Sequence, residues 1–195
     1  MAEPVGSKDD SRKNSSVSED QEDIQNSRLG DSDAYKRLID RYQDHVSSIV
    51  WRFSRDRLVH EELVQDVFVE AYLSLHTFKG KAPFSHWLSR IATRVGYRFW
   101  KQSDRQRRIK SLGPEEWKQI RGQMSDDISA IDAAELLHSL LDQLSPRDRL
   151  VLTLRFLNEC DVAETARRTG WSKTMVKVQT LRAKRKLEKI LSSQE

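Results

Sequence analysis

The sequence predicts an all-α fold of two small helical domains joined by a flexible linker. Apolar residues recur at spacings of three and four along most of the 195 residues, which is the period of one helix face. Only seven glycines and four prolines are present, too few for a loop-rich all-β fold. Hydrophobic residues make up 37% of the chain and charged residues 33%, a balance that suits two small cores better than one large core.

The first domain is predicted over residues 27–110, after an acidic stretch over residues 1–26. That stretch has almost no apolar side chains to bury, so we expect it to be disordered. Helical periodicity begins near Ser32 and Asp33, which can cap the start of a helix. Three apolar helix faces follow and can enclose one core, with a turn that contains Gly and Pro between the second and the third. They cover residues 35–53, 63–75 and 84–99.

The second domain is predicted over residues 132–195 and follows a linker over residues 111–131. The linker has no strong period and contains two glycines and a proline. A leucine stripe over residues 136–144 begins the domain, and Ser145 and Pro146 supply the cap and the first position of the next helix. The remaining helical segments cover residues 150–157, 162–169 and 173–191.

Charge alternates in blocks along the chain. The net charge is −4 over residues 1–26, +7 over 27–110, −3 over 111–134 and +4 over 135–195. Two basic blocks separated by an acidic connector are typical of two nucleic-acid-binding modules on a tether. Basic faces that are simply solvated explain the same charges, and charge alone does not separate the two interpretations.

The last two predicted helices have the residue types and spacing of a helix-turn-helix. Ala166 is small enough for two helices to approach, Gly170 suits a turn with positive φ, and Val176 would pack the second helix on the first. In such a motif the first turns of the second helix face base edges in the major groove, with cations near phosphates. The residues placed to contact duplex DNA are Lys173, Thr174, Lys177, Val178, Gln179, Leu181, Arg182 and Arg185. The plainer alternative is a basic surface helix in a bundle.

Aromatic residues alternate with cations from Phe78 to Arg108. Aromatic faces stack on unpaired bases while cations follow the backbone, which suits single-stranded DNA. Phe84, Trp87 and Phe99 lie on the apolar stripe and are expected in the core. The aromatic candidates for base contact are Tyr97 and Trp100, which lie off that stripe.

Chemical catalysis has little support in the sequence, so we expect no enzyme activity, no metal and no cofactor. The five histidines are scattered without metal-ligand spacing, and no glycine-rich phosphate loop is present. The single cysteine, Cys160, excludes an internal disulfide and fits a reducing cytosol. No apolar run is long enough to span a membrane, and the first residues have no signal-peptide pattern, so we expect a cytoplasmic protein.

Both motifs, in this order and at this distance, resemble the extracytoplasmic-function (ECF) RNA polymerase sigma factors of the sigma-70 family. The stretch with VQDVF, FKG and WLSRIA resembles conserved region two, and the stretch LLDQLSPRDRLVLTLRF resembles region four. The likeness covers about residues 32–110 and 135–191. The family pattern differs at Arg94, where many relatives have Asn, and over residues 174–179, so ordinary −35 preferences are not assumed.

The resemblance implies a transcription initiation factor that binds core RNA polymerase, recognises the −10 and −35 promoter elements and nucleates promoter melting. It implies an anti-sigma factor that holds the protein inactive, at the membrane in some cases. The clamp helices of the largest polymerase subunit would contact Glu62, Gln65, Asp66 and Glu70. The −10 element would contact Lys79, Lys81, Arg90, Arg94, Tyr97, Arg98, Trp100 and Lys101. The acidic linker would thread the RNA channel with Glu115, Glu116, Asp126 and Asp127.

Two other functions stay open on the residues alone. A dimeric helix-turn-helix regulator explains residues 161–189 but not residues 58–110. A purely protein-binding adaptor, such as a sigma-like mimic that recruits an anti-sigma factor, would not support promoter-dependent transcription.

Overall fold

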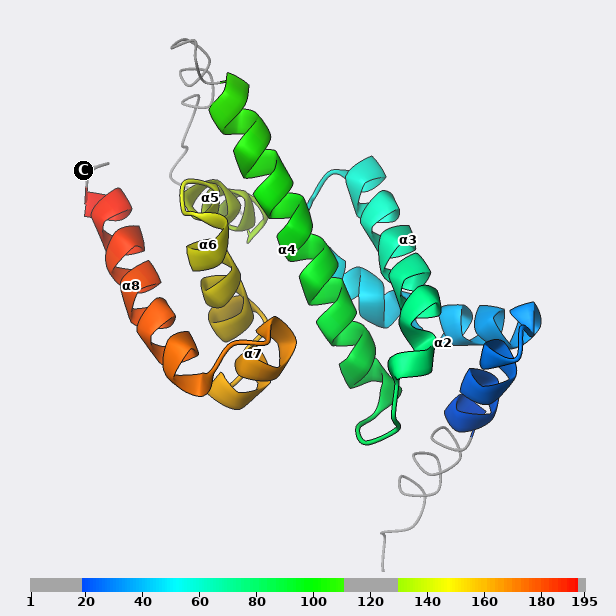
Figure 1. Ribbon diagram of the computed structural model, residues 1–195. Helices are drawn as coiled ribbons and strands as arrows, with labels where there is room; N and C mark the ends of the chain where they lie inside the picture. The colour runs from blue at the N-terminus through cyan, green and yellow to red at the C-terminus, as the bar shows by residue number, and fades with distance from the viewer. Residues whose placement is uncertain (1–18, 111–129, 193–195) are drawn as a thin grey trace, which may run out of the picture. The chain divides into compact units, whose positions relative to one another are not determined.

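The computed structural model describes residues 19–110 and 130–192 (Figure 1). Every regular element in these ranges is helical, which confirms the predicted all-α class. The chain separates into two compact units, Met1–Gly96 and Tyr97–Glu195, and the boundary falls within one long helix. The predicted linker lies almost wholly outside the described residues.

The first unit is built from α2 (Ser32–Val50), α3 (Arg57–Ser74), a 3₁₀ turn η1 (Leu75–Thr77) and the first half of α4 (Phe84–Lys110). The three helices bury the three predicted apolar faces. The side chains at the centre are almost completely inaccessible to solvent: Leu38, Val46, Val50, Val67, Ala71, Leu88, Ala92 and Val95.

Acidic side chains cap the starts of α2 and α3. Asp31, rather than the predicted Ser32 or Asp33, caps α2 by accepting hydrogen bonds from the amides of Asp33 and Ala34. Asp56 caps α3 in the same way. Each carboxylate satisfies two amides that have no partner inside the helix.

An additional helix covers residues 19–28, where the sequence analysis predicts disorder as far as residue 26. Its carboxylates bind cations on α2: Arg41 donates to Asp20 at 2.5 Å and to Asp23 at 2.9 Å, and Arg37 donates to Asp23 at 2.8 Å. The disorder prediction is therefore wrong for residues 19–26. It rested on the lack of apolar residues and missed the ion pairs that fix this helix. Residues 1–18 lie outside the described part.

The second unit contains α5 (Ala130–Asp142), α6 (Pro146–Leu152), a π-helical turn η3 (Thr153–Leu157), α7 (Val162–Thr169) and α8 (Lys173–Ser192). In Figure 1, α7 and α8 follow one another at a tight turn, and α6 lies alongside α8. The core between these helices consists of Leu141, Leu144, Val151, Leu152, Val176 and Ala183.

Three predicted helix boundaries in this unit are confirmed. Ser145 accepts the amide of Asp148 at 3.3 Å and is followed by Pro146 at the first position of α6. Asp161 caps α7, and Gly170 ends it with a φ of 75°. That angle lies in the left-handed region, which glycine adopts without the steric penalty that a Cβ brings.

Candidate nucleic-acid and polymerase interfaces

The predicted helix-turn-helix is present in α7 and α8. Thr165 and Val176 are completely buried where the two helices meet, and Ala166 is partly buried against the same core. The turn between them is fixed by Gly170 and by Ser172, whose hydroxyl accepts the Met175 amide at 3.1 Å. The first turns of α8 are thereby held in a fixed orientation on α7, as a recognition helix requires.

The outer face of α8 carries the residues predicted to contact duplex DNA. Residues 174, 177, 178, 181 and 185 follow one another at helical spacing on the side opposite Val176 and Ala183. All the predicted contact residues except Gln179 are exposed: Lys173, Thr174, Lys177, Val178, Leu181, Arg182 and Arg185. We call this set the α8 outer face.

A second cationic row lies on α4. Arg90, Arg94, Arg98 and Lys101 are all exposed and lie three or four residues apart, so they share one side of the helix. Two more of the predicted cations, Lys79 and Lys81, flank Gly80 in the exposed turn before α4. The α4 row and this turn form a continuous cationic stretch of sequence that a nucleic-acid backbone can follow.

Aromatic rings pack together at the start of α4. Phe84 stacks on Trp87 with ring centroids 5.4 Å apart, and Phe78 lies edge-on to Phe84 at 5.3 Å. Tyr42 of α2 meets the same phenyl ring at 5.3 Å. Phe84 is buried, as the sequence predicts, whereas Trp87 remains partly exposed at the rim of this cluster.

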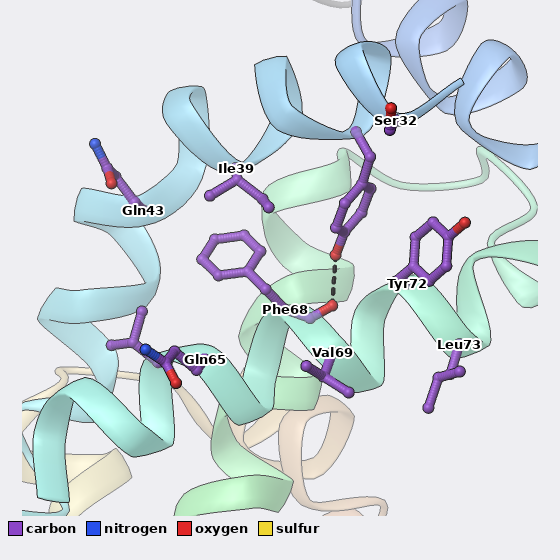
Figure 2. Close-up of a pocket in the computed structure, with 10 residues that line it drawn as sticks. Ser32, Ile39, Gln43, Gln65, Phe68, Val69, Tyr72 and Leu73 are labelled. Atoms are coloured by element: carbon purple, nitrogen blue, oxygen red, sulfur yellow. Dashed lines mark hydrogen bonds between the residues drawn. The ribbon is translucent and has the colours of Figure 1, made fainter. Parts of the chain in front are cut away.

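An apolar groove of about 710 Å³ lies between α2 and α3 (Figure 2). In this groove the Tyr35 hydroxyl donates to the Phe68 carbonyl at 2.5 Å. Three of its side chains are exposed on α3, with Val69 at 58%, Tyr72 at 47% and Leu73 at 69%. The lining residues of this α2–α3 groove are Ser32, Tyr35, Ile39, Gln43, Val64, Gln65, Phe68, Val69, Tyr72 and Leu73.

An acidic edge borders the α2–α3 groove on α3. Glu62, Gln65 and Asp66 are exposed and share a helix face with Val69 and Leu73. The predicted polymerase-contacting residues therefore lie beside an apolar surface that the sequence analysis did not identify. The sequence contains a sign of this apolar surface, because Val69 and Leu73 fall outside the apolar period of α3 and are therefore expected on its solvent side.

The comparisons with known proteins point to one family. The sequence matches the family described as sigma-70 region 2 over residues 38–106 and the family described as sigma-70 region 4 over residues 134–187. It is 28% identical over 163 residues to the ECF RNA polymerase sigma factor SigX of Bacillus subtilis, an alignment that covers 80% of this chain and 83% of SigX. This chain belongs to the ECF sigma factors of the sigma-70 family.

Other known proteins are similar in sequence or in fold. BldN of Streptomyces coelicolor is 27% identical over 170 residues, which cover 86% of this chain and 64% of BldN. CnrH, solved in complex with the cytosolic domain of CnrY, is similar with a TM-score of 0.57 at 23% identity, covering 91% of this chain and 99% of CnrH. RpoE of Bartonella quintana, solved with the anti-sigma factor NepR, has a TM-score of 0.54 at 18% identity over 81% of this chain and 96% of RpoE.

In this ECF sigma factor, region 2 corresponds to α2, α3 and α4, and region 4 corresponds to α5 through α8. Region 2 brings together the α2–α3 groove, its acidic edge and the α4 row. Region 4 carries the α8 outer face. The predicted linker contacts at Glu115, Glu116, Asp126 and Asp127 lie outside the described residues.

Gln179 is the one α8 residue whose side chain does not join the outer face. Its amide donates to the Asp148 carboxylate at 2.5 Å. Asp148 is completely buried and also accepts the Lys186 ammonium at 2.5 Å and the Ser145 hydroxyl at 2.7 Å. In the free protein the hydrogen-bonding end of Gln179 is therefore turned inward toward α6, unlike the exposed residues of the α8 outer face.

Burial alone would raise the pKa of the Asp148 carboxyl group. Hydrogen bonds from Lys186 and Ser145, together with the charge of Lys186, outweigh that effect, so the pKa of Asp148 lies below its ordinary value. The carboxylate is therefore ionised at neutral pH and links α6 to α8 in its charged form.

Trp100, which the sequence predicts as a base-stacking residue, is buried in the free protein. Its side chain is only 2% exposed. The buried guanidinium of Arg149 on α6 lies 4.0 Å from the centroid of its ring. Tyr97 is partly buried, with the Lys101 ammonium 5.9 Å from its ring centroid.

Two predicted interfaces of region 2 are joined by an ion pair. Arg94, predicted to contact the −10 element, binds the carboxylate of Glu70, predicted to contact polymerase. Arg94 is 60% exposed and Glu70 is 23% exposed, so the pair lies at the surface between α3 and α4. Both residues therefore have a partner within the free protein.

Two further features bear on the predictions from composition. Within the described ranges, no cluster of His, Cys, Asp or Glu could hold a metal ion, and no helix is long and apolar enough to cross a membrane.

Cys160 is buried, and that burial raises the pKa of its thiol. A raised thiol pKa lowers the fraction of reactive thiolate at neutral pH.

Proposed function

We propose that this ECF sigma factor binds core RNA polymerase, recognises the −10 element with region 2 and the −35 element with region 4, and nucleates promoter melting. The observation that carries the proposal is the α8 outer face. This exposed surface combines cationic, polar and apolar side chains on the second helix of a helix-turn-helix. Such a surface fits the major groove of duplex DNA.

We propose that the α2–α3 groove and its acidic edge form the polymerase-binding surface. Val69 and Leu73 present apolar area that is normally covered in a complex, and Glu62 and Asp66 add negative charge beside it. A helix with an apolar stripe flanked by basic residues complements this surface, and we assign that role to the clamp helices of the largest polymerase subunit.

We propose that the α4 row and the turn with Lys79 and Lys81 hold single-stranded DNA of the −10 element. Opening roughly a dozen base pairs costs on the order of 15–20 kcal/mol, at about 1.4 kcal/mol per stacking step. One base stacked on an aromatic residue contributes only about 1–3 kcal/mol. The sigma factor therefore nucleates melting, and polymerase must hold the rest of the open region.

Regulation by an anti-sigma factor is part of the proposal. CnrH was solved with the cytosolic domain of CnrY, and RpoE with the anti-sigma factor NepR. We propose that such a partner covers the α2–α3 groove of this protein and so competes with polymerase in the cytoplasm.

Reconstituted transcription tests the proposed function. Purified core bacterial polymerase is mixed with this protein and a genomic DNA library, and the transcript starts are mapped. We expect starts at a defined set of promoters that core polymerase alone does not use. If no start site depends on the protein, the proposal is wrong.

Footprinting without polymerase and the start-site map together separate the alternatives. An unaided dimeric regulator would leave a clear operator footprint without polymerase, whereas a sigma factor requires polymerase to protect promoter DNA. An adaptor that only recruits an anti-sigma factor would bind its partner and leave the start-site map of core polymerase unchanged.

A further inference from the structure

We propose that Val178 and Leu181 recognise thymine in the −35 element by contact with its 5-methyl group. The inference rests on the proposed function and adds a specificity to the α8 outer face. It starts from an unusual feature of that face, two apolar side chains one turn apart that are both open to solvent.

The exposure of this pair is a property of its position on α8. Val178 is 44% exposed and Leu181 is 53% exposed. The apolar residues that close the core from the same helix lie on the other side: Val176 and Ala183 are completely buried, and Leu187 packs against them. Val178 and Leu181 therefore do not belong to the core of region 4.

The surroundings of the pair favour a nucleic-acid partner. Lys177, Arg182 and Arg185 lie beside it on the α8 outer face and are exposed. A partner must therefore be strongly anionic at its edges and apolar at its centre. The major groove of duplex DNA meets both conditions where it presents a thymine, because the 5-methyl group is its apolar feature and phosphates line both sides.

The position of Gln179 supports the same conclusion. A glutamine amide can bind adenine through two hydrogen bonds, but here it is held by the buried Asp148. Between residues 177 and 181, the hydrogen-bonding side chain that remains on the outer face is Lys177. Apolar contact is then the main means of base discrimination for this turn of α8.

Replacement of thymidine by deoxyuridine tests the proposal, since thymine and uracil differ only in the 5-methyl group. The holoenzyme first selects −35 sequences from a duplex library that is random upstream of a fixed −10 element. Each thymine of the selected element is then replaced singly by deoxyuridine, and promoter retention is measured at fixed salt. We expect one or two positions at which the replacement lowers holoenzyme affinity about fourfold, the effect of one lost methyl contact.

Substitutions in the protein connect that effect to the pair. With Val178→Ala or Leu181→Ala, we expect thymine and deoxyuridine promoters to be retained equally at the corresponding position. Leu191→Ala is the matched control, because Leu191 is 46% exposed on the same helix but lies beyond the outer face, and it should keep the full difference. Far-UV circular dichroism checks that α8 remains folded in each variant.

Two outcomes overturn the inference. If the holoenzyme initiates at its promoters but tolerates deoxyuridine at every −35 position, thymine contact is wrong and the proposed function stands. If Leu181→Ala instead weakens the binding of core polymerase, the pair contacts protein and not DNA. A complete failure to initiate would refute the proposed function itself.

Discussion

Asp148 links α6 to α8 through a buried carboxylate. It is completely buried and binds Gln179 and Lys186 of α8 together with Ser145 at the start of α6. We predict that Asp148→Ala lowers the free energy of opening of region 4 by about 1.5–3 kcal/mol, because hydrogen bonds to a charged group are lost and their partners remain.

Hydrogen exchange of the α6 and α8 amides in the full chain measures this change. Glu188→Ala, at an exposed position of α8, is the control and should leave the exchange rates unaltered. Equal protection in the Asp148→Ala variant and the unmodified protein would contradict a linking role for the carboxylate.

The same carboxylate predicts a dependence of stability on pH. The pKa of Asp148 is lower in the folded protein than its ordinary value of about 3.9. The ionised form therefore stabilises the fold above that value, and the stabilisation is lost as the pH falls below about 4. We predict that region 4 of the unmodified protein loses more stability between pH 6 and pH 3 than the Asp148→Asn variant does. Urea titrations at the two pH values measure the stability of both proteins. An equal loss of stability in the unmodified protein and in the variant would disprove this.

Single residues were the hardest part to predict from the sequence. Spacing along α8 correctly selected the exposed residues from Lys173 to Arg185, but it could not show that Gln179 has a partner on α6. The burial of Trp100 was not predicted for a related reason, since its ring meets Arg149, which comes almost fifty residues later in the chain. Helix periodicity defines faces, whereas the width of the buried face depends on the packed neighbours.

At the scale of the elements, Gly96 allows α4 to approach the end of α2. A Cβ at this position would lie 2.3–2.5 Å from ring atoms of Phe53, which is buried. We predict that Gly96→Ala destabilises region 2 by about 1–3 kcal/mol, because the ring must shift inside a filled core. Chemical denaturation of the full chain gives the value.

A second substitution makes this prediction specific. Phe53→Leu removes part of the ring that meets the new methyl group, so the double variant should be more stable than the sum of the two single changes implies. Strict additivity of the two changes would show that the contact between Phe53 and α4 is not the cause.

The elements themselves were largely predictable. Apolar spacing located α2, α3 and α4, and Ser145, Asp161 and Gly170 marked boundaries in region 4 to within a residue. The helix over residues 19–28 was missed because ion pairs with Arg37 and Arg41 stabilise it. Those partners come more than ten residues later in the chain, so the composition of residues 1–26 alone could not predict the ion pairs.

At the scale of the whole molecule, the α2–α3 groove should decide whether a holoenzyme forms. We predict that Val69→Glu or Leu73→Glu lowers the affinity for core polymerase at least about tenfold, because a charge is forced against an apolar partner surface. Both side chains are mostly exposed in the free protein, so the fold is retained. Fluorescence anisotropy with labelled protein measures the affinity.

Leu29→Glu is the matched control for the groove. Leu29 is 86% exposed in the same unit and lies outside the groove lining. Its substitution should leave holoenzyme formation unchanged. A similar loss of affinity in the control and in the groove variants would indicate a general effect of added negative charge.

The ion pair between Glu70 and Arg94 has a consequence for genetic studies of this protein. Each side chain holds the other in place, so a mutant isolated for poor enzyme assembly and a mutant isolated for poor strand opening can carry changes at the same two codons. The phenotype of a single substitution would therefore not show whether holoenzyme assembly or strand opening is affected. An allele with the charges exchanged, Glu70→Arg with Arg94→Glu, keeps the attraction while reversing the charge that each position offers to its outside partner, and so distinguishes loss of the ion pair from loss of those contacts.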